Sequence, residues 1–192
     1  MHKKPELPVS IKRKISFIGS YSKRRENIIG AINSSFPVEI WGWGWGRSKL
    51  SVKKNIKIHH YVLSQADYAR EIPQSLINLN ILTVENNDLV NLRIFETTAS
   101  FGLLLTEHNS YTESLLKDGC IYYDAESVQD LNDKIASVFN EENAEWVNSV
   151  KEKGYDIIIN GQNSINDRVD QVLAALVTTK QAAEEIRPTV SN

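Results

Sequence analysis

Short apolar segments that suit buried strands alternate along this chain with longer segments that suit helices. The strand-like runs are KISFIG (14–19), PVEIWG (37–42), NIKIHHYV (55–62), LINLNIL (76–82), GLLLTE (102–107) and CIYYD (120–124). The intervening runs show helical spacing of their apolar residues. Because parallel strands need crossover connections and bury both faces, this alternation predicts a mainly parallel sheet with helices on both faces. The fold class is therefore α/β, a Rossmann-like domain.

The length of the chain fits one such domain. Its 192 residues are 41% hydrophobic, which suits a single domain with a substantial core. We predict a charged, proline-broken lead at 1–13, a Rossmann-like domain at 14–180 and a polar tail at 181–192.

Apolar spacing places each expected helix and its buried face. The first helix has Ile28, Ile29 and Ile32 on one side, and a second begins near Ser64. A helix starting at Asp88, a competent N-cap, is expected to bury Leu89, Leu92, Phe95 and Ala99. The next helix is expected to end at Gly119, and the one after it to bury Val128, Leu131, Ile135 and Val138.

Charge and composition exclude several function classes. The net charge of −2 provides no global field that would attract nucleic acid or an anionic membrane. No apolar run resembles a signal peptide or a transmembrane segment, so we expect a protein of the cytoplasm. The single cysteine, Cys120, lies in a strand-like run and is expected to fill the core.

The histidines do not suggest a metal site. His59 and His60 are adjacent, so on a strand they point to opposite faces, and no cluster of cysteine and histidine has ligand spacing. We therefore expect no metal. His108 follows the strand GLLLTE and is either a general acid or a solvated loop residue.

In parallel sheets ligands bind at the carboxyl ends of the strands, and a first candidate site follows the first strand. Gly19 and Ser20 are followed by the basic residues Lys23, Arg24 and Arg25 at a helix start. A glycine lets a phosphate approach the backbone, and free N–H groups with a nearby cation would hold it. The alternative is a solvated basic turn.

A second candidate lies on the helix expected to begin at Asp88. There Asn91, Arg93 and Glu96 are polar residues interleaved with apolar ones. Arg93 and Glu96 are three residues apart, so a plain ion pair on the helix surface would also explain them. The place of this helix between two strongly apolar strands favours a binding role, because a central crossover helix begins at the carboxyl edge.

The segment WGWGWG (41–46) is the third unusual feature. Its tryptophans either stack on a sugar or base, or cap the core and contact a partner domain.

Several strings together resemble a known family. The run NLNILTVENNDLVNLRIFETTASFGLLLTEHNSYTESL (78–115), followed by YYDAESVQDLNDKI (122–135), resembles the donor-binding, C-terminal domain of group 1 bacterial glycosyltransferases. It is most similar to the spore-maturation branch, in which an Asn-x-Arg-x-Phe-Glu helix precedes an apolar strand ending in Thr. ISFIGSYSKRRENII (15–29), VEIWGWGW (38–45) and the segment around Arg168 fit the same pattern, so the resemblance spans 14–176.

This resemblance implies one half of a GT-B fold and roles for individual residues. Glu96 sits where the family binds the ribose diol, and Asp88 falls at the first acid of the family's paired-acid motif, near the transferred sugar. The residues implied to hold the diphosphate are Asn91 and Leu92 through backbone N–H groups and Arg93 through its side chain, with Gly19, Ser20 and Lys23 or Arg24 opposite. Because cations and a helix dipole can offset the diphosphate charge, no metal or other cofactor is implied.

The chain departs from the family at a few positions. Thr98, Ser100 and Phe101 stand where Pro, Cys and Gly are usual, and Asn163 stands in place of a histidine before the last helix. Phe101 replaces a glycine near the expected crevice, and its side chain would narrow this crevice.

The resemblance implies a glycosyltransferase that takes a nucleotide diphosphate sugar as donor. The acceptor-binding half would come from a longer chain or a separate subunit, and the isolated chain is expected to be inactive. Alternatives are a non-catalytic nucleotide-binding module and a flavodoxin-like interaction domain; the latter leaves Arg93 and Glu96 without a role beyond a weak ion pair.

Overall fold

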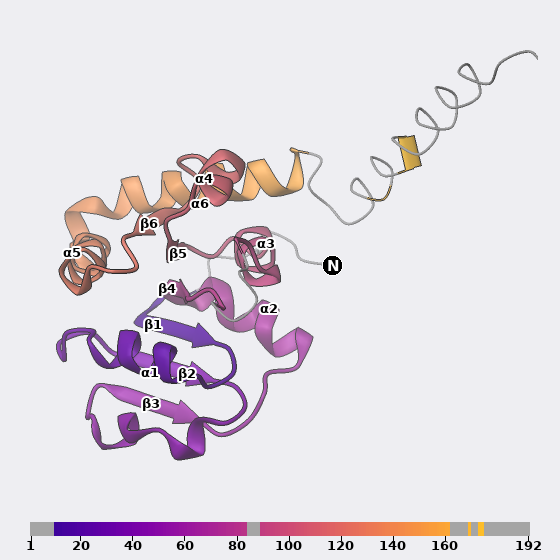
Figure 1. Ribbon diagram of the computed structural model, residues 1–192. Coiled ribbons are helices and arrows are strands. Elements are labelled where there is room, and N and C mark those ends of the chain that lie inside the picture. The colour runs from indigo at the N-terminus through magenta and orange to yellow at the C-terminus, as the bar shows by residue number, and fades with distance from the viewer. Residues whose placement is uncertain (1–9, 84–88, 162–168, 170–172, 175–192) are drawn as a thin grey trace, which may run out of the picture.

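The computed structural model describes residues 10–83, 89–161, 169 and 173–174 (Figure 1). The strands are β1 (Lys12–Ile18), β2 (Val38–Trp41), β3 (Ile56–His59), β4 (Ser75–Asn80), β5 (Leu104–Glu107) and β6 (Ile121–Tyr123). The α-helices are α1 (Lys23–Gly30), α2 (Gln65–Gln74), α3 (Leu92–Ala99), α4 (Ser110–Leu116), α5 (Val128–Phe139) and α6 (Ala144–Ile159). Short 3-10 turns cover η1 (Trp45–Arg47), η2 (Lys49–Val52) and η3 (Glu141–Asn143).

The strands form one parallel sheet in the order β3-β2-β1-β4-β5-β6. The chain winds outward from β1 to β3, returns to β4 beside β1, and then winds the other way to β6. The topological switch point therefore lies between β1 and β4, where ligands bind in doubly wound sheets. This confirms the predicted α/β class. The flavodoxin-like alternative is wrong in its architecture, because that fold has the order 2-1-3-4-5.

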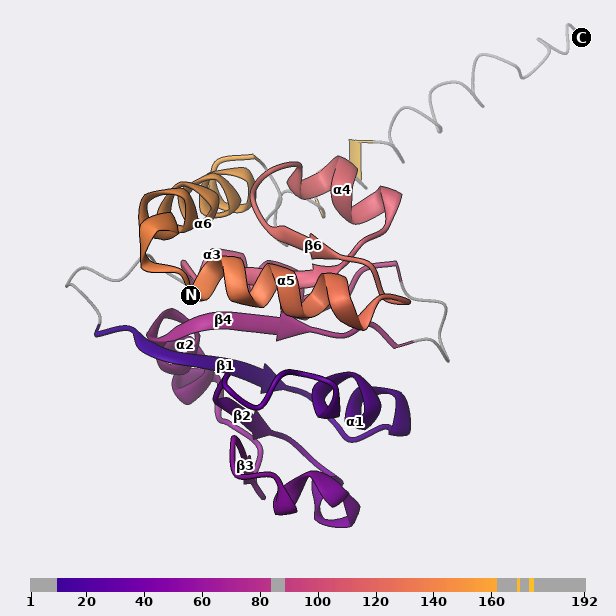
Figure 2. The same ribbon diagram turned by 90° about the vertical axis from the view of Figure 1, so that its left-hand side faces the viewer.

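Helices cover both faces of the sheet (Figures 1 and 2). On one face α1 and α5 pack on the branched apolar side chains of the central strands, which form the larger core cluster. On the other face α3, α4 and part of α6 enclose a second cluster around Ile94, Leu104 and Leu116. Cys120 is buried in this second cluster, as predicted. The core thus supports β1 and β4 from both sides and fixes their carboxyl ends.

The helix predicted from Asp88 begins later than expected. Its first residue is Leu92, because Asn91 has an extended backbone (φ −133°, ψ 167°) and acts as the N-cap; Asp88 itself lies outside the described residues. The predicted apolar face is wrong in its first turn, since Leu89 and Leu92 are 53% and 70% exposed. Ala99 is buried as predicted, and the other buried residues of the helix are Ile94, Thr97 and Thr98.

The helix predicted to end at Gly119 ends at Leu116. The positive φ at the end of this helix is that of its C-cap, Lys117 (49°). Gly119 serves a packing role, because an added Cβ there would lie 2.7 Å from the Cα of Gly154 on α6. Val128, the first residue of α5, is 53% exposed, whereas Leu131, Ile135 and Val138 are buried as predicted.

In the part of the chain that the structure describes, no helix combines the length and apolar character needed to cross a bilayer.

The strand β1 begins at Lys12, slightly before the predicted domain start at Lys14.

Candidate functional site

A crevice of about 440 Å³ lies at the topological switch point. Its volume is within the range of small-molecule binding sites. The ends of β1 and β4, the start of α3 and one side chain of α1 line it. The lining residues are Phe17, Ile18, Gly19, Ser20, Arg25, Asn80, Ile81, Thr83, Asn91, Leu92, Arg93 and Glu96. The strand and helix ends that sequence analysis placed at the carboxyl edge therefore do meet.

The start of α3 presents backbone donors to this crevice. Asn91 makes no side-chain cap: its Nδ2 donates to Asn80 Oδ1 at 2.9 Å, and its Oδ1 accepts no hydrogen bond from the described residues. By contrast α1, α2, α4 and α5 are each capped by a serine or asparagine side chain. Among the described residues, no side chain caps the Leu92 and Arg93 amides. An uncapped helix start offers N–H groups and the positive end of the helix dipole to an anion.

Arg93 and Glu96 form the i,i+3 ion pair expected from their spacing. Arg93 Nη1 lies 2.7 Å from Glu96 Oε2, and the guanidinium stacks on the Tyr68 ring at 4.5 Å from its centroid. The two side chains are 37% and 31% exposed, so water reaches the pair. Both residues line the crevice, which leaves the Glu96 carboxylate accessible to a ligand as well as to Arg93.

The three basic residues of α1 take different positions. Lys23 is 68% exposed and pairs with Glu26 at 2.6 Å, outside the crevice lining. Arg24 pairs with the buried Glu107 at 2.7 Å, also outside the lining. Arg25 is the basic residue of α1 that lines the crevice. The role of Lys23 and Arg24 in binding stays a prediction. The sequence placed Arg25 in the same basic cluster, but Arg25 was not among the residues predicted to hold the diphosphate.

Arg25 bridges the two strand ends that form the crevice. Its Nη1 donates to the Ser20 carbonyl at 3.0 Å and to Ser20 Oγ at 3.1 Å. Its Nη2 donates to the Ile81 carbonyl at 3.2 Å and to Thr83 Oγ1 at 3.1 Å. The guanidinium is therefore held between the β1 end and the segment that follows β4.

The WGWGWG segment shapes the turn after β1. Gly42 has φ +147°, and a Cβ there would lie 2.0 Å from the Gly19 carbonyl oxygen, so this position requires glycine. Trp45 is buried and its Nε1 donates to the same Gly19 oxygen at 2.8 Å. Trp41 is also buried and stacks on His59, while Trp43 is 80% exposed. The segment thus holds Gly19 in place, and none of its tryptophans lines the crevice.

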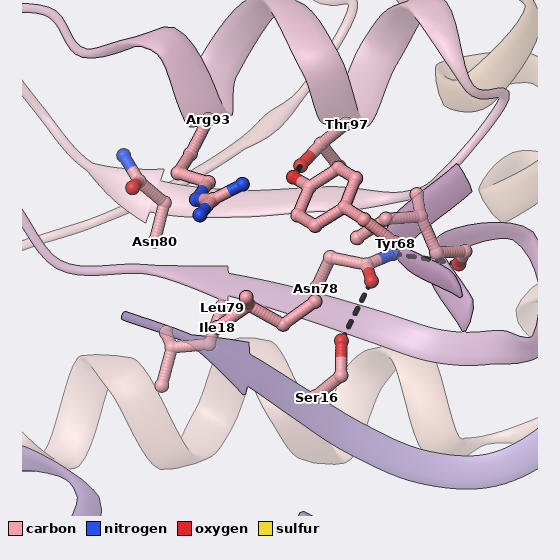
Figure 3. A pocket seen from close by; sticks show the side chains of 9 residues that line it. Ser16, Ile18, Tyr68, Asn78, Leu79, Asn80, Arg93 and Thr97 are labelled. Atoms are coloured by element: carbon pink, nitrogen blue, oxygen red, sulfur yellow. Dashed lines mark hydrogen bonds between the residues drawn. The ribbon is translucent and has the colours of Figure 1, made fainter. Parts of the chain in front are cut away.

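A small cavity with several polar side chains adjoins the crevice and was not predicted from the sequence (Figure 3); the two share Ile18, Asn80 and Arg93. Its volume is about 10 Å³, close to what one water molecule occupies. Ser16 Oγ donates to Asn78 Oδ1 at 2.7 Å, and Tyr68 OH lies 3.3 Å from Thr97 Oγ1. The signal in the sequence was the pair of asparagines in LINLNIL, which an entirely apolar buried strand would not contain.

The remaining candidates lie elsewhere. His108 is half-exposed and sits 3.2 Å from Glu113 on α4, in keeping with a solvated loop residue. His59 bonds Glu39 at 2.8 Å, and the described residues contain no group of three potential metal ligands.

The expectation that Phe101 narrows the crevice is wrong. Phe101 has φ 60° and follows the C-terminal end of α3, where its ring packs against Tyr155 of α6. It therefore lies at the end of α3 opposite the crevice. Its positive φ is a backbone conformation that glycine adopts more readily than phenylalanine. Asn163 lies outside the described residues.

Several solved structures share this fold. An α,α-trehalose 6-phosphate synthase from Burkholderia multivorans has a TM-score of 0.73 at 14% identity, over 94% of this chain and 45% of that one. S. aureus TarM, solved with UDP, has a TM-score of 0.69 at 14% identity, over 90% and 37%. The C-terminal domain of a group 1 family glycosyl transferase from Francisella tularensis has a TM-score of 0.63 at 14% identity, over 82% and 94%.

These coverages show how much of each relative the chain represents. It covers less than half of the trehalose 6-phosphate synthase and TarM chains but 94% of the isolated C-terminal domain. The fold is thus the Rossmann-like half of a GT-B fold. No curated protein matches by sequence. A family model described as glycosyl transferase-like matches residues 24–174, more than half of the chain, and the chain therefore belongs to this glycosyl transferase-like family.

Proposed function

We propose that this chain is a donor-binding half of a glycosyltransferase and that its crevice holds the diphosphate of a nucleotide sugar. The uncapped start of α3 carries the proposal, because it faces the same crevice as Gly19 and Arg25. Backbone N–H groups with an adjacent guanidinium are the donors that a diphosphate requires. The resemblance of 78–115 to spore-maturation-type donor domains supports the same assignment.

Glu96 is proposed to bind the ribose. It follows Leu92 by about one helical turn, which places its Cα roughly 6 Å along the axis from that of Leu92, whose amide would hold phosphate. A carboxylate accepts hydrogen bonds from both hydroxyls of a 2′,3′-diol. Its ion pair with Arg93 fixes the carboxylate on the crevice side. UDP, GDP or a related nucleoside diphosphate is thus the class of ligand proposed.

The proposed site uses protein charges rather than a metal. Arg25, Arg93 and the α3 dipole supply positive charge around the expected diphosphate position. Fixed cations and dipoles can stabilise the charge that develops on a leaving group. We propose that neither a metal nor an organic cofactor is required.

A second Rossmann-like half is proposed to cover the crevice and to bind the acceptor. Exposed apolar side chains surround the carboxyl edge of the sheet: Trp43 (80%), Tyr61 (56%), Val62 (61%), Leu89 (53%) and Leu92 (70%). Apolar side chains gathered at one edge mark a contact surface. Without that half, the acceptor is not held in reacting geometry, a contribution of about 7 to 11 kcal/mol. We expect donor binding but no acceptor-dependent transfer from this half alone.

A thermal-shift panel tests the proposed binding. UDP or GDP at about 100 times the dissociation constant stabilises the folded state by about 2.7 kcal/mol, a rise of several degrees in Tm for a chain of this size. AMP, which lacks a diphosphate, is expected to give a much smaller shift. Equal Tm values with and without every nucleoside diphosphate at millimolar concentration contradict the proposal.

A further inference from the structure

A buried carboxylate lies behind the crevice without lining it. Glu107, the last residue of β5, is 4% exposed. Nothing in the proposed binding of a nucleoside diphosphate uses it directly. A buried carboxylate is costly unless it is paired and hydrogen-bonded, so its contacts show what it does for the fold.

Glu107 holds the segment that leaves β4. Its Oε2 accepts the backbone N–H of Leu82 at 3.1 Å. Its Oε1 accepts a charged bond from Arg24 Nη1 at 2.7 Å and a weaker one from Tyr123 OH at 3.3 Å. Arg24 Nη1 in turn donates to the Leu82 carbonyl at 3.3 Å. The N–H and the carbonyl of Leu82 are thus both fixed by one ion pair.

Leu82 lies between the two residues that hold Arg25. The Ile81 carbonyl and Thr83 Oγ1 accept the bonds of Arg25 Nη2, and both residues line the crevice. Since β4 ends at Asn80, the sheet ladder does not place this segment. Side-chain contacts must therefore satisfy and position its backbone.

We propose that Glu107 is a positioning residue of the crevice, acting through Leu82 on the Arg25 guanidinium; this inference rests on the proposed function. Glu107 and Arg24 fix Leu82, Leu82 places Ile81 and Thr83, and these hold Arg25 where it meets the diphosphate. In this proposal Arg24 supports nucleotide binding without lining the crevice, because it fixes Leu82 together with Glu107.

Glu107→Gln is the direct test, with Glu26→Gln as its matched control. Glu26 is likewise a buried carboxylate, but its partners lie outside the crevice lining: Lys23 Nζ, Tyr21 OH, Ser48 Oγ and the Lys49 N–H. The first readout is the NMR signal of the Arg25 Nε–H group in ligand-free protein. We expect Glu107→Gln to shift or broaden it and Glu26→Gln to leave it in place. An unchanged Arg25 signal in folded Glu107→Gln overturns the proposal whether or not nucleotide binds.

The second readout is the dissociation constant for UDP at a temperature where each variant is folded. Glu107→Gln is expected to raise it roughly threefold to thirtyfold. In an Arg25→Met background the same change should have almost no further effect, because Glu107 acts through Arg25. Equal effects in both backgrounds overturn the proposal, since a purely structural role predicts them.

The failures of the two proposals are distinguishable. If the wild-type chain does not bind UDP or GDP, the proposed function fails, while the Arg25 signal still decides whether Glu107 positions it. Should Glu107→Gln not fold, Tyr123→Phe removes one donor to Glu107 and leaves the Leu82 and Arg24 contacts. A smaller change of the Arg25 signal is then expected, and an unchanged Arg25 signal overturns the proposal.

Discussion

Replacing Glu96 by Gln separates a ligand-binding carboxylate from a structural one. In the free protein the carboxylate is 31% exposed and pairs with Arg93 three residues earlier on the same helix. Exposed pairs of this kind contribute about 0.2 to 1 kcal/mol. The amide keeps the size of the side chain, so the free energy of unfolding is expected to fall by less than about 1 kcal/mol.

The expected effect on binding is much larger. A carboxylate that accepts hydrogen bonds from a ribose diol contributes about 1.5 to 3 kcal/mol, so the dissociation constant for UDP or GDP should rise roughly tenfold to a hundredfold. Isothermal titration calorimetry measures it, and urea denaturation of the same samples gives the stability.

A control carboxylate makes the result specific. Asp133 on α5 is exposed, accepts a hydrogen bond from Gln129 at 2.8 Å, and is outside the crevice lining. Asp133→Asn should leave nucleotide affinity unchanged. If Glu96→Gln binds nucleotide as tightly as wild type but loses more than about 1 kcal/mol of stability, the carboxylate is structural and the ribose assignment is refuted.

Further predictions concern the supports of the site. The Lys23 ammonium, followed by the Lys49 N–H, lowers the pKa of Glu26 from 4.5 to about 2, so this carboxylate stabilises the fold above pH 4.5 and the contribution is lost as pH falls through about 2. Urea unfolding over that window should show a shallower pH dependence for Glu26→Gln than for wild type; parallel curves exclude this contribution. Gly42→Ala should destabilise the fold by about 2 to 4 kcal/mol through strain and its clash with Gly19, whereas Gly46→Ala, with nothing within 4 Å, should be nearly neutral in the same unfolding assay. Burial raises the pKa of the Cys120 thiol to about 12, so thiol reagents at neutral pH should modify it only after unfolding, and rapid labelling of folded protein would contradict its burial.

The sequence predicted the sheet because each strand carries its own signal. Runs such as GLLLTE and LINLNIL are bounded by polar or glycine residues and separated by helical spacing, and these local features suffice for a parallel α/β fold. The strand order was not readable in the same way. It depends on which strands pair over long range, and the switch point between β1 and β4 appears only in the fold.

The start of α3 shows where local signals mislead. Asp88 is a good N-cap by type, and Leu89 and Leu92 continue a helical apolar pattern. The chain nevertheless stays extended at Asn91, whose side chain bonds Asn80 on the neighbouring strand. This boundary therefore coincides with a tertiary contact that the local sequence pattern does not reveal, and the first amides of the helix have no side-chain cap.

The sequence could not show which basic residue of α1 lines the crevice, for a related reason. Lys23, Arg24 and Arg25 are equivalent in composition, and only their angular positions around the helix distinguish them. Arg25 lines the crevice because Ser20, Ile81 and Thr83 converge on it, and the latter two follow it by more than fifty positions. Arg93 and Glu96 could be predicted, since their spacing alone places them on one side of a helix.

An NMR titration with UDP tests the central claim most directly, because it reports on each backbone amide separately. In ¹⁵N-labelled protein, the amide signals of Leu92 and Arg93 are expected to shift most, together with those of Gly19 and Ser20 across the crevice. Uridine, which has the same base and ribose but no phosphate, should leave the Leu92 and Arg93 signals nearly unchanged. If UDP at millimolar concentration moves no signals, or moves signals elsewhere while those of Leu92 and Arg93 stay in place, the start of α3 is not a diphosphate site and the proposed function is contradicted.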